Sequence, residues 1–566
     1  MLSGYLSSVR VANASRRFSG FSRLRYTHNV NFSAESDIKS AEALDYQNRK
    51  DIIASDPSSS YPTIRNARAN VSSQAETIRI PSFRSKFEDV DFSQYENNRF
   101  PGQTFIVEGK IESIRKSGKA MYFIDIRQDG QQLQVMASNK SMGISVGEFD
   151  TAHQSLKKGD FIMCHGFASV TKVGELTIKV DAPLKLLSPC LNAIPNRLVD
   201  RKNINAQRVL NYLVNRDSQT PILVKSYIIQ AIRSFLLQNN FLEVNTPILS
   251  GAGTGANAKP FATVAHSIST TDAKEAAVQL RVAPELWLKK LVIGGFEKIF
   301  EIGSNFRNEG IDSTHNPEFT SCEFYQSFTS LPELMQMTEN MFKYIHEDLI
   351  VRAAKLQSIT SNLDALDSFT RPFPKYEFVP TLESKTGIPL PQELTSSNMI
   401  EYYQKLNLPV PDNKSPANLL DNISGIYLES ISNEFENVPV FIYNQPAVLS
   451  PLAKSADVTY DGGRTYDISL RFELFINGKE YVNAYEEENS PFDQLAKFKL
   501  QQEARDEFKD EEMLIPDLEY IKAMEYGLPP TGGWGCGIDR LAMLFAGVDR
   551  IDSVLPFGNL RDVKKQ

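Results

Sequence analysis

Charged side chains stand in three segments whose other residues have the alternating apolar pattern of buried strands. The first segment, residues 300–325 (FEIGSNFRNEGIDSTHNPEFTSCEFY), carries Arg307, Glu309 and Glu323 among aromatic and aliphatic neighbours. A charge inside an apolar strand costs free energy unless it is paired or binds something charged. The segment therefore predicts either a structural ion-pair network or one part of a binding site for a charged ligand.

The second segment, residues 470–488 (LRFELFINGKEYVNAYEEE), carries two carboxylates seven residues apart on either side of an INGK turn. A hairpin at this turn folds Glu473 and Glu480 back toward each other. Because no basic residue is expected in register with them, the two carboxylates suit a hard cation such as Mg²⁺. A solvated strand face is the structural alternative.

The third segment, residues 529–545 (PPTGGWGCGIDRLAMLF), places four glycines before a helix that is predicted to begin near Asp539. Glycine permits close approach of the backbone to a ligand. Arg540 falls in the first turn of that helix, and an arginine beside a helix N-terminus is a strong site for a polyanion. A flexible turn is the alternative interpretation.

Taken together, the three segments contain what a nucleoside triphosphate requires. Arg307 and Arg540 supply charge for the phosphates, Glu473 and Glu480 suit Mg²⁺, and the ring of Phe319 suits the base. No G-x-G-x-x-G or G-x-x-x-x-G-K-[ST] loop stands where a strand turns into a helix, so the usual phosphate-binding loops are not expected.

Hydrophobic periodicity predicts the elements that must position these residues. Apolar side chains at helical spacing predict a helix from Pro221 to Asn239. Residues 241–249 (FLEVNTPIL) predict a strand that Pro247 confines to a sheet edge or a strand end. Further strands are expected at 298–306, 318–328, 469–478 and 479–487, with helices at 332–354 and 493–507. This arrangement predicts an α+β domain with a mixed, mainly antiparallel sheet flanked by helices.

Five short alternating runs precede that domain and are separated by turn signals. They are FIVEGKIESIR, AMYFIDIRQ, QQLQVMAS, DFIMCHGFASV and ELTIKV, between residues 105 and 180. An OB-fold is a five-stranded barrel of this size that often binds oligonucleotides, although an SH3-like or other small barrel fits the periodicity as well.

Composition limits the class of protein. The 566 residues are 41% hydrophobic and 23% charged, which is typical of a folded chain of several domains. The net charge of −8 argues against a protein that coats nucleic acid by charge alone, so any such contact must be local. No apolar run approaches the roughly 18 residues of a membrane-spanning helix. Neither a CxxC nor an HxxxH pair marks a zinc site.

Residues 1–34 differ from the rest in composition. They contain five arginines, no lysine and no acidic residue, which is typical of a mitochondrial transit peptide, whereas a basic RNA-binding tail is the alternative. Loss of these five arginines changes the net charge to −13. Residues 35–95 are polar and are expected to form a loosely ordered extension.

The three charged segments resemble motifs 2 and 3 of class II aminoacyl-tRNA synthetases, and FLEVNTPIL resembles motif 1, whose proline lies at the dimer interface in this class. RVAPELWLKKLVIGGFEKIFEIG, RNEGIDSTHNPEFTSCEFY and GKEYVNAYEE are similar to lysyl-tRNA synthetases in particular. The resemblance covers roughly residues 100–566. It implies an OB-fold anticodon-binding domain at 96–190, a linker at 191–218 and a class II catalytic domain at 219–566.

The resemblance also implies roles for single residues. Arg307 holds the substrate carboxylate and the α-phosphate of ATP, and Arg540 holds the γ-phosphate. The other expected ATP-binding residues are Glu309 and Phe319 for adenine, His315 and Asn316 near the phosphates, and Glu473 and Glu480 on Mg²⁺.

For L-lysine, the resemblance implies that the α-amino group binds Gly255 and Glu285. Asn483 assists Arg307 with the carboxylate. The ε-ammonium is received by Glu323, Tyr325 and Glu487, and Tyr485 stacks along the aliphatic stem. Carboxylates are needed there because a buried cation must be compensated for its lost hydration.

In the barrel, the positions that match the family's anticodon-reading residues are Arg115, Tyr122, Gln134 and Glu175. Stacking of an unpaired base on Tyr122 and hydrogen bonds from the others are expected, while an ordinary exposed barrel face is the alternative.

The function implied is activation of L-lysine with ATP, release of pyrophosphate, and transfer of lysine to the 3′ end of tRNA(Lys), by a homodimer in the mitochondrial matrix. An aspartyl- or asparaginyl-tRNA synthetase is the alternative in the same class. An aspartate enzyme needs a cation where Glu487 stands, and EYVNAYEEE offers none. A non-catalytic RNA-binding paralogue is expected to lack Arg307, Arg540 or the carboxylate pair, and all are present.

Overall fold

The computed structural model describes residues 32–69, 71, 74–251, 255, 258–265, 277–353, 359–508 and 516–564. The chain divides into two compact units, Met1–Pro195 and Asn196–Gln566, and each is considered by itself. Nearly all of the predicted transit peptide lies outside the described residues. Within the described ranges, no helix has the length and apolar character needed to cross a membrane.

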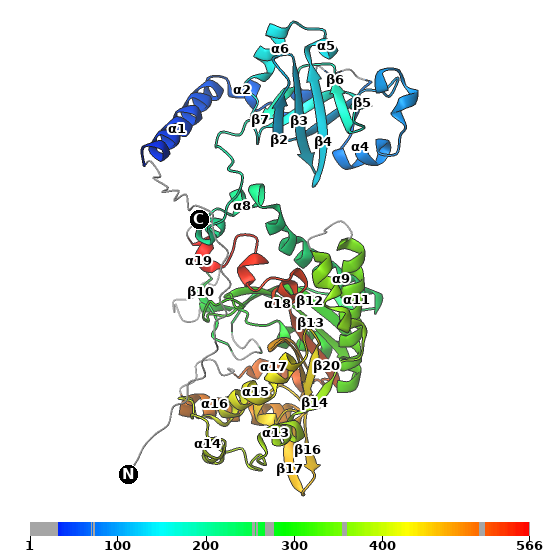
Figure 1. The fold of residues 1–566 in the computed structure, drawn as a ribbon. Helices are drawn as coiled ribbons and strands as arrows, with labels where there is room; N and C mark the ends of the chain where they lie inside the picture. Colours follow the sequence, from blue (N-terminus) through cyan, green and yellow to red (C-terminus); the bar gives the residue numbers. More distant parts are fainter. Residues whose placement is uncertain are drawn as a thin grey trace, which may run out of the picture. The chain divides into compact units, whose positions relative to one another are not determined.

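The first unit contains the five-stranded barrel predicted from the sequence (Figure 1). Its strands follow the order β2-β3-β4-β6-β5, and β5 pairs back onto β2, which closes the barrel. This is the OB-fold, and the prediction is confirmed. The strands are β2 (Phe105–Lys116), β3 (Met121–Gln128), β4 (Gln131–Ser138), β5 (Phe161–Val170) and β6 (Leu176–Val180), with β1 (Glu76–Thr77) and β7 (Lys185–Ser188) added at the edges and α5 (Asn139–Met142) and α6 (Val146–His153) between β4 and β5.

The structure differs from the expectation of a loosely ordered extension at residues 35–95. This segment forms α1 (Phe32–Ser55), α2 (Pro57–Ser60), α3 (Ile64–Arg68) and α4 (Ile80–Phe87). Phe83, Phe87 and Phe92 are buried in the barrel core. Arg49 of α1 forms a buried ion pair with Asp160, at 2.7 Å. The few apolar residues of the segment thus pack into the barrel core, although the segment as a whole is polar in composition.

The second unit is built on an eight-stranded sheet in the order β14-β15-β18-β19-β20-β13-β12-β8 (Figure 1). All neighbours are antiparallel except the outermost pairs, β14 with β15 and β12 with β8. The strands are β8 (Leu242–Glu243), β12 (Lys298–Phe306), β13 (Glu318–Ser327), β14 (Lys375–Glu377), β15 (Val440–Tyr443), β18 (Arg471–Ile476), β19 (Lys479–Glu486) and β20 (Thr531–Gly537). The α+β prediction is confirmed, and β8, from FLEVNTPIL, lies at the sheet edge.

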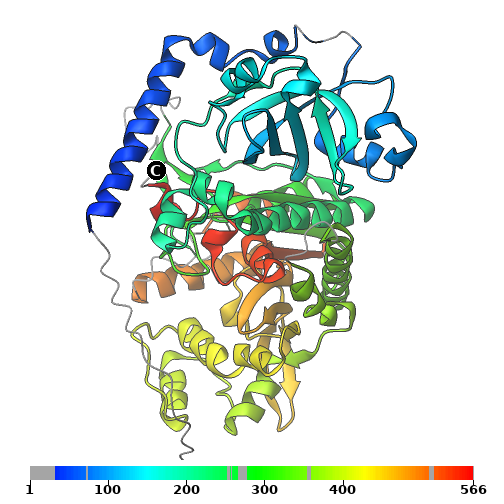
Figure 2. The same cartoon turned by 45° about the horizontal axis from the view of Figure 1, so that its top comes forward.

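Helices α9 (Thr220–Gln238), α11 (Leu331–Ala353) and α18 (Ile538–Ala546) pack on one face of this sheet, as Figure 2 shows from a second direction. Side chains alternate along the strands, so Cys322 and Phe324 of β13 and Trp534 of β20 join the helices in the core. The residues between them face the opposite side of the sheet, where the candidate site lies.

Short helices occupy the segment that the sequence analysis treats as a polar linker, α7 (Arg201–Ala206) and α8 (Arg208–Val214). A separate apolar cluster is formed by side chains between Phe378 and Phe475 in the sequence. The remaining elements of the unit are α10 (Glu285–Ile293), α12 (Thr360–Asp364), α13 (Phe378–Thr386), α14 (Ser396–Lys405), α15 (Pro416–Tyr427), α16 (Pro491–Phe508), α17 (Leu518–Met524), α19 (Leu560–Val563), β9 (Leu249–Ser250), β10 (Ala262–Val264), β11 (Ala277–Leu280) and the hairpin of β16 (Ser455–Tyr460) and β17 (Arg464–Ser469).

Candidate active site

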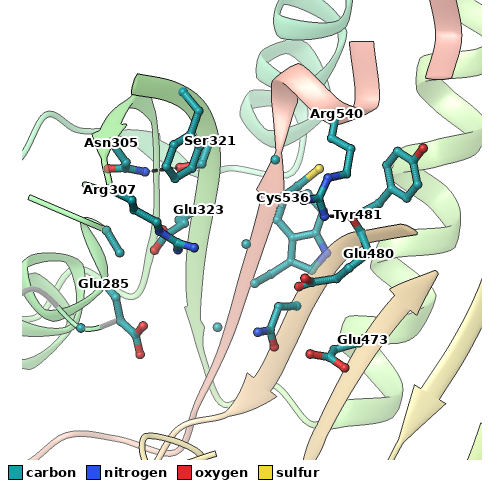
Figure 3. A pocket seen from close by; sticks show the side chains of 18 of the residues that line it. Glu285, Asn305, Arg307, Ser321, Glu323, Glu473, Glu480, Tyr481, Cys536 and Arg540 are labelled. Carbon is teal, nitrogen blue, oxygen red and sulfur yellow. Dashed lines mark hydrogen bonds between the residues drawn. The ribbon is translucent and has the colours of Figure 1, made fainter. Parts of the chain in front are cut away.

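A cavity of about 460 Å³ opens on the sheet face opposite the helices and has the size of a small-ligand site. The structure brings into this one cavity every residue predicted to bind ATP or lysine. They are Gly255, Glu285, Arg307, Glu309, His315, Asn316, Phe319, Glu323, Tyr325, Glu473, Glu480, Asn483, Tyr485, Glu487 and Arg540. Figure 3 shows Arg307, Glu285 and Glu323 on one side of the cavity and Glu473, Glu480 and Arg540 on the other.

The floor between these two sides is the glycine-rich strand β20. Gly533 lies opposite Tyr325 on one neighbouring strand and opposite Tyr485 on the other. A Cβ atom at Gly533 would stand 2.0 Å from Oε1 of Glu487 and 2.7 Å from Cε1 of Tyr325. The glycine is therefore required sterically, because any larger residue would displace the side chains that form the wall.

Arg307 follows β12 and brings a positive charge into the cavity. Among the described residues no carboxylate forms an ion pair with it, and its Nε atom is buried without a hydrogen-bond partner. Its guanidinium lies 5.2 Å from the ring centre of Phe319. An unpaired cation beside an aromatic face suits a ligand that has both an anionic group and a planar base.

Arg540 approaches from the first turn of α18. Its Nη2 donates to Nε2 of His315 at 3.0 Å, and its Nη1 donates to the backbone oxygen of Glu480. Nδ1 of His315 lies 2.8 Å from Oδ2 of Asp312, so this histidine is held between an arginine and a carboxylate. Asn316 donates to the carbonyl of Glu318 and accepts from the amide of Leu560, and thus also stabilises its loop.

Glu480 points into the cavity because of a β-bulge. Leu474 of β18 pairs with Val482, but the next residue, Phe475, pairs with Glu480, so Tyr481 is the extra residue on β19. Without the shift, alternation would direct Glu480 to the face opposite that of Asn483. Burial, and then the charge of Glu473, raise the pKa of Glu480. Two carboxylates that repel each other in a cavity that also contains Arg540 fit a divalent cation held by one or two side chains and by the phosphates of the substrate.

One expectation about this carboxylate pair is wrong. The sequence predicts no basic residue in register, but Arg471 on the same strand forms an ion pair with Glu473. Nε of Arg471 also donates to Oδ1 of Asn483 at 2.9 Å. Gln445 donates to the other oxygen of Glu473 at 2.7 Å. Within the described ranges, there is no group of three or more His, Cys, Asp or Glu side chains that could hold a metal ion. A cation here would therefore also need oxygen atoms of the bound substrate.

Three carboxylates form the other end of the cavity, of which Glu285 and Glu487 are buried and Glu323 is partly exposed. Tyr485 donates to Oε1 of Glu285 at 2.5 Å, and Tyr325 donates to Oε2 of Glu323 at 3.2 Å. Burial, and then the charge of Glu285, raise the pKa of Glu323 to about 8. Burial also raises the pKa of Glu487, against the opposing effect of Lys289. Such a cluster is poised to receive positive charge.

Lys289 contacts two carboxylates of the site and was not predicted from the sequence. It lies on α10, one turn after Glu285, and its Nζ atom forms ion pairs with Glu285 at 2.6 Å and with Glu487. The side chain is completely buried. Its signal in the sequence is a lysine four residues after a glutamate within the apolar stretch PELWLKKLVI.

In the barrel, burial contradicts the base-stacking role predicted for Tyr122. Only 1% of this residue is exposed, and its hydroxyl donates to Asp150 at 3.1 Å. The neighbouring Phe123 lies on the opposite, partly exposed face, directly across from Arg115. Gln134 points to the same side of the sheet but is only 4% exposed, and it donates to Glu175 at 2.7 Å. Phe123 therefore has the position that stacking requires.

Comparisons with known proteins agree with this geometry. Residues 200–561 match the family model "tRNA synthetases class II (D, K and N)", and residues 105–182 match "OB-fold nucleic acid binding domain". The fold and the site thus define a class II aminoacyl-tRNA synthetase of the aspartate, lysine and asparagine group, an ATP-using class.

Curated relatives narrow the class. The mitochondrial lysine–tRNA ligase of Schizosaccharomyces pombe is 39% identical, over 87% of this chain and 90% of its own. The mitochondrial lysine–tRNA ligase of Saccharomyces cerevisiae is 37% identical, over 89% of this chain and 90% of its own. A lysine–tRNA ligase of a Thermotoga species is 36% identical, over 79% and 84%. The chain belongs to the lysyl-tRNA synthetases, and the prediction of a lysine–tRNA ligase is confirmed.

Proposed function

We propose that this lysine–tRNA ligase forms lysyl-adenylate in the described cavity, with Mg²⁺, and charges tRNA(Lys) in the mitochondrial matrix as a homodimer. The observation that carries the proposal is the presence in a single cavity of one arginine without an ion pair, Arg307, and of three carboxylates, Glu285, Glu323 and Glu487. L-lysine has the complementary pattern of one carboxylate and two ammonium groups.

In the proposed ground state, Arg307 binds the lysine carboxylate with help from Asn483. Glu285, next to Gly255, receives the α-amino group, and Glu487 receives the ε-ammonium. Oε1 of Glu487 is buried and has no hydrogen-bond partner among the described residues, which supports its pairing with a ligand. Glu323 and Tyr325 complete the ammonium site, and Tyr485 packs along the stem.

The adenylation step requires no protein nucleophile. A carboxylate oxygen of lysine attacks the α-phosphorus of ATP, a new O–P bond forms, and pyrophosphate leaves with the electrons of the broken bond. Arg307 neutralises the charge that develops at the α-phosphate, and Arg540 and His315 hold the departing phosphates. Glu309 and Phe319 fix the adenine. Mg²⁺ bound at Glu473 and Glu480 would supply further charge neutralisation to the phosphates.

In the transfer step, a ribose hydroxyl at the 3′ end of tRNA attacks the carbonyl carbon of the adenylate, and AMP leaves. We propose that the barrel reads the anticodon through Arg115, Phe123, Gln134 and Glu175. Stacking on an aromatic ring with hydrogen bonds at base edges is the usual way to recognise unpaired bases.

Two features support the finer points of localisation and assembly. Residues 1–34 have the composition of a mitochondrial leader, and two of the relatives are mitochondrial ligases. About half of the surface of Leu242, at the edge of the catalytic sheet, and of Ile248 and Leu249, a few residues further along the chain, is exposed, and a second copy would cover it. Sedimentation of the purified chain tests the dimer, and a monomer at micromolar concentration would refute it.

The proposal is tested by amino-acid-dependent exchange of pyrophosphate into ATP with the full chain and its Glu487→Gln variant. Removing one partner from a buried charge pair costs about 3–5 kcal/mol, so the lysine KM should rise at least about 100-fold while the ATP KM stays unchanged. Glu486→Gln is the matched control, because Glu486 accepts from the Leu331 amide outside the cavity. An unchanged lysine KM in the Glu487→Gln variant would refute the subsite.

A further inference from the structure

Lys289 forms ion pairs with two of the three carboxylates of the proposed lysine subsite. Its Nζ atom lies 2.6 Å from Oε1 of Glu285, forms an ion pair with Oε2 of Glu487, and lies 5.5 Å from the ring centre of Tyr485. None of this side chain is exposed. A permanently buried ammonium in a pocket that must bind another ammonium requires an explanation.

The arrangement of oxygen atoms provides one. Lys289 and the Tyr485 hydroxyl both use Oε1 of Glu285, and neither uses Oε2. At Glu487, the ion-pair contact of Lys289 is with Oε2, and neither oxygen of this buried carboxylate has a hydrogen-bond partner in the described part of the chain. The contacts of Lys289 are thus with one oxygen of each carboxylate, and the other oxygen of each is available to the ligand.

The charges lead to the same conclusion. Glu285, Glu323 and Glu487 place up to three negative charges in the subsite, whereas lysine offers two ammonium groups. A third negative charge would stay buried and uncompensated, which is strongly unfavourable. Burial acts to lower the pKa of Lys289, but Glu285 and Glu487 outweigh it and raise the pKa, so this residue is a cation at neutral pH.

We propose that Lys289 is a positioning residue for amino-acid recognition, which fixes one oxygen of Glu285 and one of Glu487. Its positive charge reduces the charge of the three carboxylates from −3 to −2, which matches the two ammonium groups of L-lysine. This inference rests on the proposed lysine subsite. It assigns to α10 a role in substrate selection, because the helix supplies both an acid and the cation that orients it.

The test compares Lys289→Met with the full chain in lysine-dependent pyrophosphate exchange. The lysine KM should rise at least about 100-fold, while the ATP KM changes less than about threefold, because a buried pair has lost one partner only at the amino-acid end. Lys290→Met is the matched control on the same helix. Lys290 binds Asp517 at 3.1 Å outside the cavity, so this variant should keep both constants.

A second variant separates charge from packing. Lys289→Ala leaves a space that n-propylammonium fills with the same chain length and charge, whereas 1-propanol fills it without charge. Propylammonium should lower the lysine KM of this variant at least about tenfold, and 1-propanol should not. A structural support role would make the two additives equivalent.

The outcomes are distinct. A wild-type chain that shows no lysine-dependent exchange refutes the proposed subsite itself. A responsive wild-type chain overturns the inference alone if Lys289→Met keeps or lowers the lysine KM. The inference is also overturned if Lys289→Met raises the lysine KM and the ATP KM together. It is overturned too if propylammonium lowers the lysine KM of Lys289→Ala no more than 1-propanol does.

Discussion

Replacing Glu323 by glutamine should change how lysine binding depends on pH. Burial and the neighbouring Glu285 raise the pKa of Glu323 to about 8, so the free enzyme holds this side chain mostly protonated at neutral pH. The ammonium of bound lysine favours the carboxylate form. Lysine binding below pH 8 must therefore expel a proton, and the lysine KM should fall as pH rises.

The magnitude follows from the pKa alone. One proton released on binding makes the lysine KM about tenfold higher at pH 7, and about 100-fold higher at pH 6, than the plateau reached above pH 8. In Glu323→Gln that proton is missing, so the slope of log KM against pH should become shallower by about one unit. The plateau value should rise, because a charged partner of the ammonium is lost.

Pyrophosphate exchange between pH 6 and 8.5, at saturating ATP, measures this slope directly. Glu486→Gln is again the control and should keep the wild-type slope, since its carboxylate lies outside the cavity. Tyr325→Phe provides a second check. The Tyr325 hydroxyl donates to Glu323 and lowers its pKa, so removing it should shift the profile to higher pH. Equal slopes in wild type and Glu323→Gln would refute the reasoning.

Three further outcomes are expected. Gly533→Ala places a Cβ atom 2.0 Å from Oε1 of Glu487, so the lysine KM in pyrophosphate exchange should rise at least about tenfold; an unchanged value contradicts the steric argument. Phe123→Ala should weaken binding of the tRNA, measured by titration, by about 1–3 kcal/mol without affecting pyrophosphate exchange, and equal tRNA affinity would exclude stacking. Arg281→Met leaves Glu301 as an unpaired buried charge, so urea denaturation should show a loss of about 3–5 kcal/mol in the free energy of unfolding, and a loss below about 1 kcal/mol would contradict the buried pair.

Most of the catalytic site was predictable because its residues stand beside strong local signals. Arg307 and Glu323 interrupt apolar strands, and Arg540 follows a glycine run, so the sequence marks each position without knowledge of the fold. Lys289 escaped because its partner Glu487 is 198 positions away and only the tertiary structure joins α10 to the end of β19. Spacing along one segment does not report such a contact.

The barrel contains a different kind of failure. Tyr122 alternates with Ile124 and Ile126, which places all three on one strand face, and that face is the core. Residue matching assigned Tyr122 to the ligand, whereas the period of two already assigns it to the interior and Phe123 to the outside. Phe83 and Phe87 are a similar case, since one helical turn separates them within an otherwise polar segment.

The position of β20 at the centre of the catalytic sheet also determines the width of the active site. One wall of the cavity stands on β13 and the other on β19, and both strands are hydrogen-bonded to β20. The separation of the walls is therefore two interstrand spacings, about 10 Å, a length fixed by main-chain hydrogen bonds. Side-chain substitutions in either wall alter which groups are bound, but the width of the cavity across β20 is fixed by the backbone.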